Sequence, residues 1–225
     1  MATETKPAMT REERMATQPI GRLMAGMTLP AILAQIINIL YSIIDRIYIG
    51  HMEGVGANAL PGVGVTFCIT VFISAFSAFI SNGAAPLAAI WLGKGDREHA
   101  EKILGNSVSF LMLCTVALMT FFYAFQRPLL YMFGASDATI GYAMDYLSIY
   151  LLGTLFVELA LGLNAFIICQ SQPRIAMFSV LIGAVANIVL DPVFIFGLHM
   201  GVKGAAIATV ISQGLSAAWV MSFLL

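Results

Sequence analysis

The chain has 225 residues, of which 60% are hydrophobic and only 10% are charged, and its mean hydropathy is +0.90. Soluble domains are about 45–50% apolar and about 25% charged, so this composition excludes an ordinary soluble protein. It predicts an all-α, polytopic membrane protein whose surroundings are the lipid bilayer. The formal net charge is −1, and the sequence has no basic stripe, which excludes nucleic acid as a partner.

Residues 1–22 are polar and have no apolar core, so we expect a cytosolic N-terminal arm and not a signal peptide. Six apolar segments follow, and each is long enough to cross a bilayer, which takes about 20 residues. The expected helices cover residues 27–50, 58–92, 103–126, 140–169, 174–197 and 204–225. Together they make residues 23–225 a six-helix transmembrane lobe, in which Pro86 is expected to break the second helix.

The basic residues predict the orientation of these helices, because cytoplasmic loops carry an excess of Lys and Arg. Arg127 and Lys203 fall on one side of the predicted membrane. Eight fall on the other: Lys6, Arg11, Arg14, Arg22, Lys94, Arg97, Lys102 and Arg174. We therefore expect a multi-pass protein of the cell (plasma or inner) membrane with a cytoplasmic N-terminus. Residues 219–225 carry no polar anchor, so we also expect one half of a longer chain.

Two carboxylates, Asp45 and Asp191, lie inside predicted membrane helices, where a charged side chain is costly and usually functional. Asp45 is 18 residues past Met27, and Asp191 is 17 residues past Arg174. At about 1.5 Å per residue the two acids lie at a similar depth in the outer half of the membrane. We expect them to share one cavity.

Each acid has polar companions on its own helix. Tyr41 and Asn38 precede Asp45 at helical spacing, with Gln35 beside them, and Asn187 lies one turn before Asp191. A carboxylate, a carboxamide and a carbonyl freed by Pro192 can together hold a proton or a small hard cation. The pattern predicts a proton or Na⁺ site at Asp45, Asp191 and Asn187, with no other cofactor.

A second polar stripe follows the fourth helix, where Tyr146, Tyr150, Thr154 and Glu158 recur every four residues. Glu158 either faces the same cavity or pairs with another helix. Thr209 on the last helix is a further candidate. The candidates for a cavity or substrate site are Gln35, Asn38, Tyr150, Glu158 and Asn164.

Several stretches resemble the MATE (multidrug and toxic compound extrusion) family of cation-coupled antiporters. They are Leu29-Pro30, residues 43–50, the loop from Leu92 to Asp96, residues 162–166, residues 187–192 and residues 201–209. The resemblance implies twelve helices in two lobes, of which this chain would be the N-terminal lobe, with a C-terminal six-helix lobe as its partner. In the DinF-like branch the implied cation-site residues are Tyr41, Asp45, Asn187, Asp191 and Thr209, with Asn164.

The predicted function is that of a secondary antiporter that exports organic cations, drugs or other amphiphilic compounds in exchange for H⁺ or Na⁺. One alternative is a flippase for lipid-linked oligosaccharides, which would be expected to line its cavity with basic residues. Arg46 is the single embedded cation in the sequence. A distant alternative is an intramembrane aspartyl protease, because Gly93-Lys94-Gly95-Asp96 fits a GxGD pattern, although that Asp lies in a predicted loop.

Overall fold

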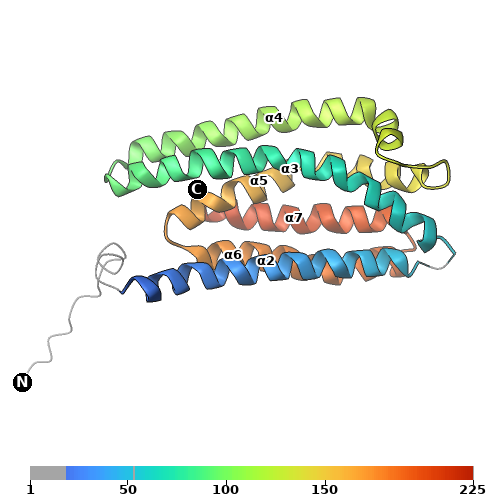
Figure 1. Ribbon diagram of the computed structural model, residues 1–225, viewed down its shortest axis with the longest axis horizontal. Helices are drawn as coiled ribbons and strands as arrows, with labels where there is room; N and C mark the ends of the chain where they lie inside the picture. The colour runs from blue at the N-terminus through green and yellow to red at the C-terminus, as the bar shows by residue number, and fades with distance from the viewer. Residues whose placement is uncertain (1–18, 53, 225) are drawn as a thin grey trace, which may run out of the picture.

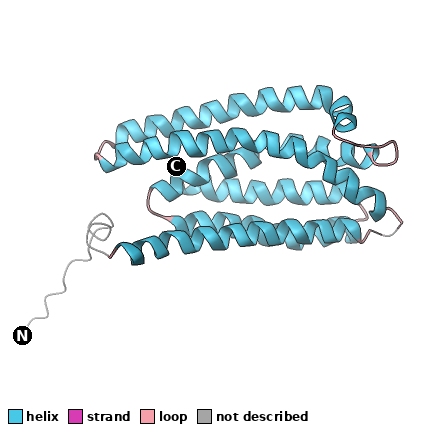
Figure 2. Cartoon of the chain, viewed as in Figure 1, coloured by secondary structure: helices cyan, strands magenta, loops and turns pink. Residues whose placement is uncertain are grey.

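The computed structural model describes residues 19–52 and 54–224, which form a bundle of long helices (Figures 1 and 2). The helices are α2 (Ile20–Gly50), α3 (Gly56–Gly93), α4 (Arg97–Met132), α5 (Ile140–Cys169), α6 (Pro173–Pro192) and α7 (Val202–Leu224), with a short π-helix, η1 (Val193–Gly197), after α6. Most of the predicted arm of residues 1–22 lies outside the described residues, although α2 already begins at Ile20.

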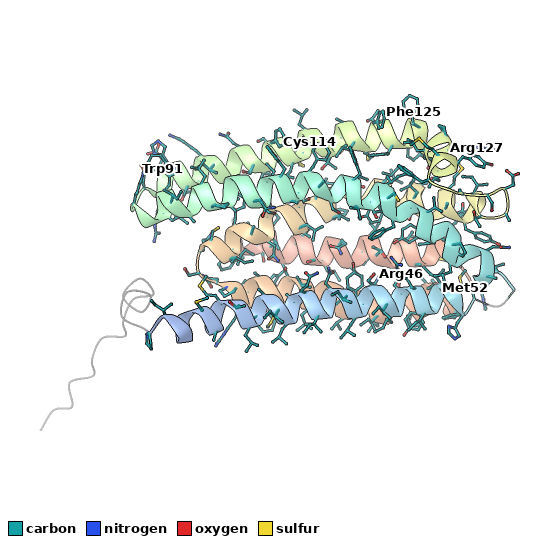
Figure 3. The ribbon with its side chains drawn as sticks, viewed as in Figure 1. Arg46, Met52, Trp91, Cys114, Phe125 and Arg127 are labelled. Atoms are coloured by element: carbon teal, nitrogen blue, oxygen red, sulfur yellow. The ribbon has the colours of Figure 1, made fainter. Side chains whose placement is uncertain are left out.

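Within the described residues, six helical segments are long and apolar enough to cross a membrane. They run alternately in opposite directions, so that the start of α2 and the end of α7 lie at the same end of the bundle (Figure 1). Trp91 and Arg127 mark opposite ends of the bundle in Figure 3. The prediction of an all-α, six-helix membrane fold is confirmed.

Helix α5 occupies the centre of the bundle and packs against α3, α4 and α7, whereas α2 packs mainly against α6. Leu147, Leu151 and Leu163 of α5 are completely buried. Close approach of α5 to α7 depends on Gly153, because a Cβ atom at this position would overlap the side chain of Val210. Small residues at such crossings let membrane helices approach closely, since apolar side chains alone gain little by leaving lipid.

Helix α3 lacks the break predicted for it, and helix α4 extends beyond its predicted end. Helix α3 continues through Pro86 to Gly93, so the prediction of a break at Pro86 is wrong. Helix α4 likewise continues through Pro128 to Met132, six residues past the predicted end. A proline removes one backbone donor, but ending the helix inside the membrane would leave several backbone groups without partners. Continuing the helix therefore costs less than stopping it.

The connection between α3 and α4 is shorter than predicted, because α4 begins at Arg97 and not near residue 103. Asp96 caps this helix: its carboxylate accepts a hydrogen bond from the backbone N–H of His99 at 3.1 Å. The same carboxylate lies 2.7 Å from Nδ1 of His99. An Asp at this position satisfies one of the unpaired N–H groups of the first turn and favours an early helix start.

Candidate functional site

The carboxyl groups of Asp45 on α2 and Asp191 on α6 lie close enough to interact electrostatically, where the two helices pack against each other. Both side chains are buried, with 9% of Asp45 and none of Asp191 exposed. Asp45 Oδ1 and Asp191 Oδ2 have no hydrogen-bond partner among the described residues. Two neighbouring buried carboxylates repel each other when both are ionised, so the pair favours a bound proton or cation.

Asn187 connects Asp191 to the last helix. Its Nδ2 atom donates to Asp191 Oδ1 at 3.3 Å and also lies 3.4 Å from the hydroxyl oxygen of Thr209 on α7. The amide oxygen, Asn187 Oδ1, is buried and has no partner. It therefore adds a free oxygen ligand beside the two carboxylates.

The backbone changes its helical form directly after Asp191. Helix α6 ends at Pro192, and η1 continues the chain with wider turns, as the bond from Leu198 N–H to Val193 O at 2.8 Å shows. Short π-helical segments often accompany functional sites in helices. Gly204, near the start of α7, permits this geometry, because a Cβ atom there would lie 2.8 Å from the carbonyl of Phe194.

A cavity of about 170 Å³ opens beside the acid pair. Its lining includes Tyr41 and Asp45 of α2, Tyr146 and Tyr150 of α5, and Thr209 of α7. Pockets for drug-sized ligands measure roughly 300–1,000 Å³, so this cavity alone is too small for such a compound. It has room for ions and water molecules.

Arg46 is the cation beside this site. It lines the cavity next to Asp45, and its guanidinium carbon lies 5.6 Å from the centre of the Phe67 ring on α3. Figure 3 places Arg46 on α2 in the half of the bundle that ends at Met52. One guanidinium can balance one carboxylate of the pair, so the second still requires a proton or a cation.

The structure thus brings together Tyr41, Asp45, Tyr150, Asn187, Asp191 and Thr209. It does not bring the remaining candidates there. Gln35 and Asn38 are exposed on α2, outside the cavity lining. Asn164 Nδ2 donates to Ala176 O at 3.3 Å on α6, and Glu158 is enclosed by other helices. The roles of all these residues in ion coupling stay predictions.

Two residues of this site were not among the predicted site residues. Tyr146 lines the cavity and its hydroxyl lies beside Thr209, and Gln213 on α7 lies beside the hydroxyl of Tyr41. Tyr146 is four residues before Tyr150, and Gln213 is four residues after Thr209. A search one helical turn to either side of each predicted site residue would have found both Tyr146 and Gln213.

Comparison with known proteins identifies relatives of the chain. The family model MatE matches residues 30–193. Multidrug export protein MepA of Staphylococcus haemolyticus is 27% identical over 197 residues, which are 88% of this chain and 43% of that protein. An FAD transporter of Shewanella oneidensis is 25% identical over 202 residues, 88% of this chain and 44% of that protein.

Solved structures show the same fold. A crystal structure of MATE in the bent conformation superposes with a TM-score of 0.85 and covers 96% of this chain and 48% of that one, at 24% identity. This likeness concerns the fold alone. The chain spans less than half the length of the curated relatives it matches.

Proposed function

The chain belongs to the MATE family of membrane transporters, and on this premise we propose that it is the N-terminal half of a secondary antiporter of the DinF-like branch. The antiporter exports organic cations, drugs or other amphiphilic compounds in exchange for H⁺ or Na⁺. One relative is named a multidrug export protein and another an FAD transporter, which supports export of amphiphilic molecules. The second six-helix lobe is the expected partner.

The observation that carries this proposal is the pairing of Asp45 with Asp191 beside a small polar cavity. The pair cannot carry two negative charges without a compensating cation. Binding of H⁺ or Na⁺ therefore stabilises one arrangement of α2 and α6, and release of the ion allows another. If the substrate favours the ion-free arrangement, reciprocal linkage makes ion entry drive substrate release.

The size of the cavity indicates how substrate and ion divide the space. At about 170 Å³ the cavity suits the ion, and a larger compound needs additional volume. Large apolar side chains of α2, such as Ile36, Leu40 and Ile43, are about half exposed in this lobe. We assign the substrate to the space between this surface and the second lobe, with the ion site opening from its side.

We propose that the protein lies in the cell (plasma or inner) membrane and that the end of the bundle with Lys94 and Arg97 faces the cytoplasm. Arg127 lies at the opposite end. The acid pair, five residues from the end of α2 at Gly50, is then in the outer half of the membrane. An ion entering from outside would reach the pair over a short distance.

The protease alternative is wrong, because the family is one of transporters and not of enzymes. Asp96 also lies outside the membrane helices, where it caps α4. Transport of an anionic compound is a second candidate, since Arg46 lines the cavity and one relative is an FAD transporter. A flippase for lipid-linked oligosaccharides would be expected to have several basic residues in its cavity. The lining of this cavity holds one, Arg46, which argues against that alternative.

Ion binding can be measured on the chain in lipid nanodiscs. Equilibrium binding of radioactive Na⁺ and proton uptake should both be saturable, and each ion should displace the other. Asp45→Asn and Asp191→Asn should each remove this competition, whereas Asp137→Asn, at an exposed carboxyl outside the site, should leave it unchanged. Competition between Na⁺ and protons that survives in both site variants would overturn the proposal.

A further inference from the structure

Glu158 is a third embedded acid that the acid pair does not account for. It lies in the middle of α5 with no exposed surface, and neither oxygen of its carboxyl group makes a hydrogen bond within the described residues. Ser77 on α3 is the polar residue beside the carboxyl group. Among the described residues, none of the ion pairs includes Glu158. An ionised carboxylate is hardly tolerated in such a position, because nothing replaces the water it has lost.

Two hydroxyl groups from neighbouring helices lie at the level of Glu158. Ser77 on α3 donates its hydroxyl to the backbone oxygen of Glu158 at 3.4 Å. On α4, Leu111 packs against Gly162 of the antiparallel helix α5, so Thr115, one turn further along α4, is level with Glu158. The Thr115 hydroxyl is buried and has no hydrogen-bond partner in the part of the chain that the structure describes. Two unsatisfied polar groups therefore lie at the same level on the packed helices α4 and α5.

The other titratable groups near Glu158 do not neutralise it. Cys114 on α4 and Tyr150 on α5 are close enough to sense its charge, and neither side chain can carry a positive charge. No described Lys, Arg or His forms an ion pair with Glu158. Figure 3 places Cys114 midway along α4. Glu158 thus forms an environment separate from the acid pair.

The stripe on α5 connects this region to the cavity. Tyr146 and Tyr150 line the cavity, and the hydroxyl of Thr154 donates to Tyr150 O at 3.1 Å. Each step of four residues turns by about 40° around a helix of 3.6 residues per turn. The stripe therefore rotates from the cavity towards α3 and α4 over the roughly 12 Å between Tyr150 and Glu158.

We propose that Glu158 is a second proton-binding site of the lobe, in which the protonated carboxyl group donates to the hydroxyl of Thr115. Tyr150 and Thr154, on the same stripe of α5, lie between this site and the cavity. A metal ion fits this site less well, because hard cations take about six oxygen ligands and the side chains here offer about four. The inference concerns proton occupancy and stands whether or not Asp45 and Asp191 couple transport.

Infrared difference spectroscopy on the chain in lipid nanodiscs tests this assignment, because a protonated carboxyl group has a C=O band that a carboxylate lacks. The double variant Asp45→Asn, Asp191→Asn leaves Glu158 as the one acid embedded in the described helices. At neutral pH this variant should keep a protonated-carboxyl band. Adding Glu158→Gln should remove the band completely.

Further variants separate a proton site from other outcomes. Thr115→Val should retain the band and shift its frequency, because the carboxyl group loses its hydrogen-bond partner. Ser109→Val, which changes an exposed hydroxyl on the same helix, should leave the frequency unchanged. If Glu158→Gln does not fold, Glu158→Asp should instead move the band. A band that is unaffected by either Glu158 variant, or that Na⁺ converts to a carboxylate signal, would overturn the proposal.

Discussion

The side-chain amide of Asn187 lies one helical turn before Asp191 and donates to its carboxylate at 3.3 Å. An amide can orient a carboxylate, but it carries no charge with which to balance one. The second contact of the amide, to Thr209 at 3.4 Å, fixes the distance between α6 and α7 at the same level. Asn187 therefore holds the site in shape, and the charge balance depends on the bound ion and on Arg46.

Asp45→Asn and Asp191→Asn should each abolish ion-coupled efflux in a transporter that joins this chain to a second six-helix lobe. Each substitution removes a charge on which the differential binding of the ion depends, while the shape of the side chain is kept. Efflux from inverted vesicles after an imposed pH or Na⁺ gradient measures the effect. Wild-type efflux in both variants would reduce the acids to a structural role.

Asn187→Ala should have a smaller effect than either acid variant. The loss of a hydrogen bond to a charged group corresponds to about 1.5–3 kcal/mol, or about a tenfold to hundredfold change in apparent affinity for the ion. The affinity should fall if the ion is Na⁺ and rise if it is H⁺, because the amide stabilises the ionised carboxylate. Transport at saturating ion should be largely retained. Titration of efflux against ion concentration distinguishes this outcome, and an unchanged midpoint would contradict the supporting role.

The sequence predicted the bundle well, because apolar length and charge distribution report directly on membrane crossing. The equal depth of Asp45 and Asp191 also anticipated their proximity. Spacing along a helix, however, does not say which neighbour a face meets, so the isolation of Glu158 and the packing of Asn164 against α6 required coordinates. The prediction of a break at Pro86 was wrong because the membrane favours an unbroken helix.

Gly153→Ala should destabilise the bundle, because the new methyl group would overlap Val210 at the crossing of α5 and α7. Overpacking of this kind costs about 1–3 kcal/mol. Gly105→Ala on α4 is the matched control, since a Cβ atom there meets open space and alanine favours the helix. Thermal unfolding in detergent should show a lower midpoint for Gly153→Ala alone. Adding Val210→Ala should restore part of the loss, and equal midpoints for both glycine variants would refute the packing argument.

Asp96 predicts a pH dependence at the start of α4. The backbone N–H of His99 donates to the carboxylate and holds the pKa of Asp96 below its ordinary value. Because the pKa of Asp96 is lower in the folded protein, the ionised carboxylate stabilises the folded state. This stabilisation is complete above the ordinary carboxyl pKa of about 4 and is lost as the pH falls through the pKa of Asp96 in the folded protein. Hydrogen exchange of the first turn of α4, corrected for its intrinsic pH dependence, should rise on acidification. Asp96→Ala should raise exchange already at neutral pH and leave efflux unchanged.

The proposed orientation predicts which engineered cysteines react from each side of the membrane. In a background without Cys68, Cys114 and Cys169, a membrane-impermeant thiol reagent applied to intact cells should label Arg127→Cys. It should not label Lys94→Cys until the membrane is opened, because Lys94 lies at the end with the excess of basic residues. The reverse pattern would invert the topology and place the acid pair in the inner half.

Arg46 offers a way to distinguish export of cations from export of anions. Its guanidinium lines the cavity, so it repels a positively charged substrate and attracts a negatively charged one. Arg46→Gln removes that charge while retaining a polar side chain of similar length, and Arg46→Lys retains the charge as a control. For a transporter of organic cations, Arg46→Gln should strengthen substrate binding severalfold, because it removes a like charge from the cavity that adjoins the space assigned to the substrate, and such a repulsion is weakened by distance and salt. Competition assays with a lipophilic cation and with an anionic dye, both at fixed pH, measure the two affinities side by side. Weaker binding of the anion in Arg46→Gln, with cation binding unchanged, would favour the anionic substrate class instead.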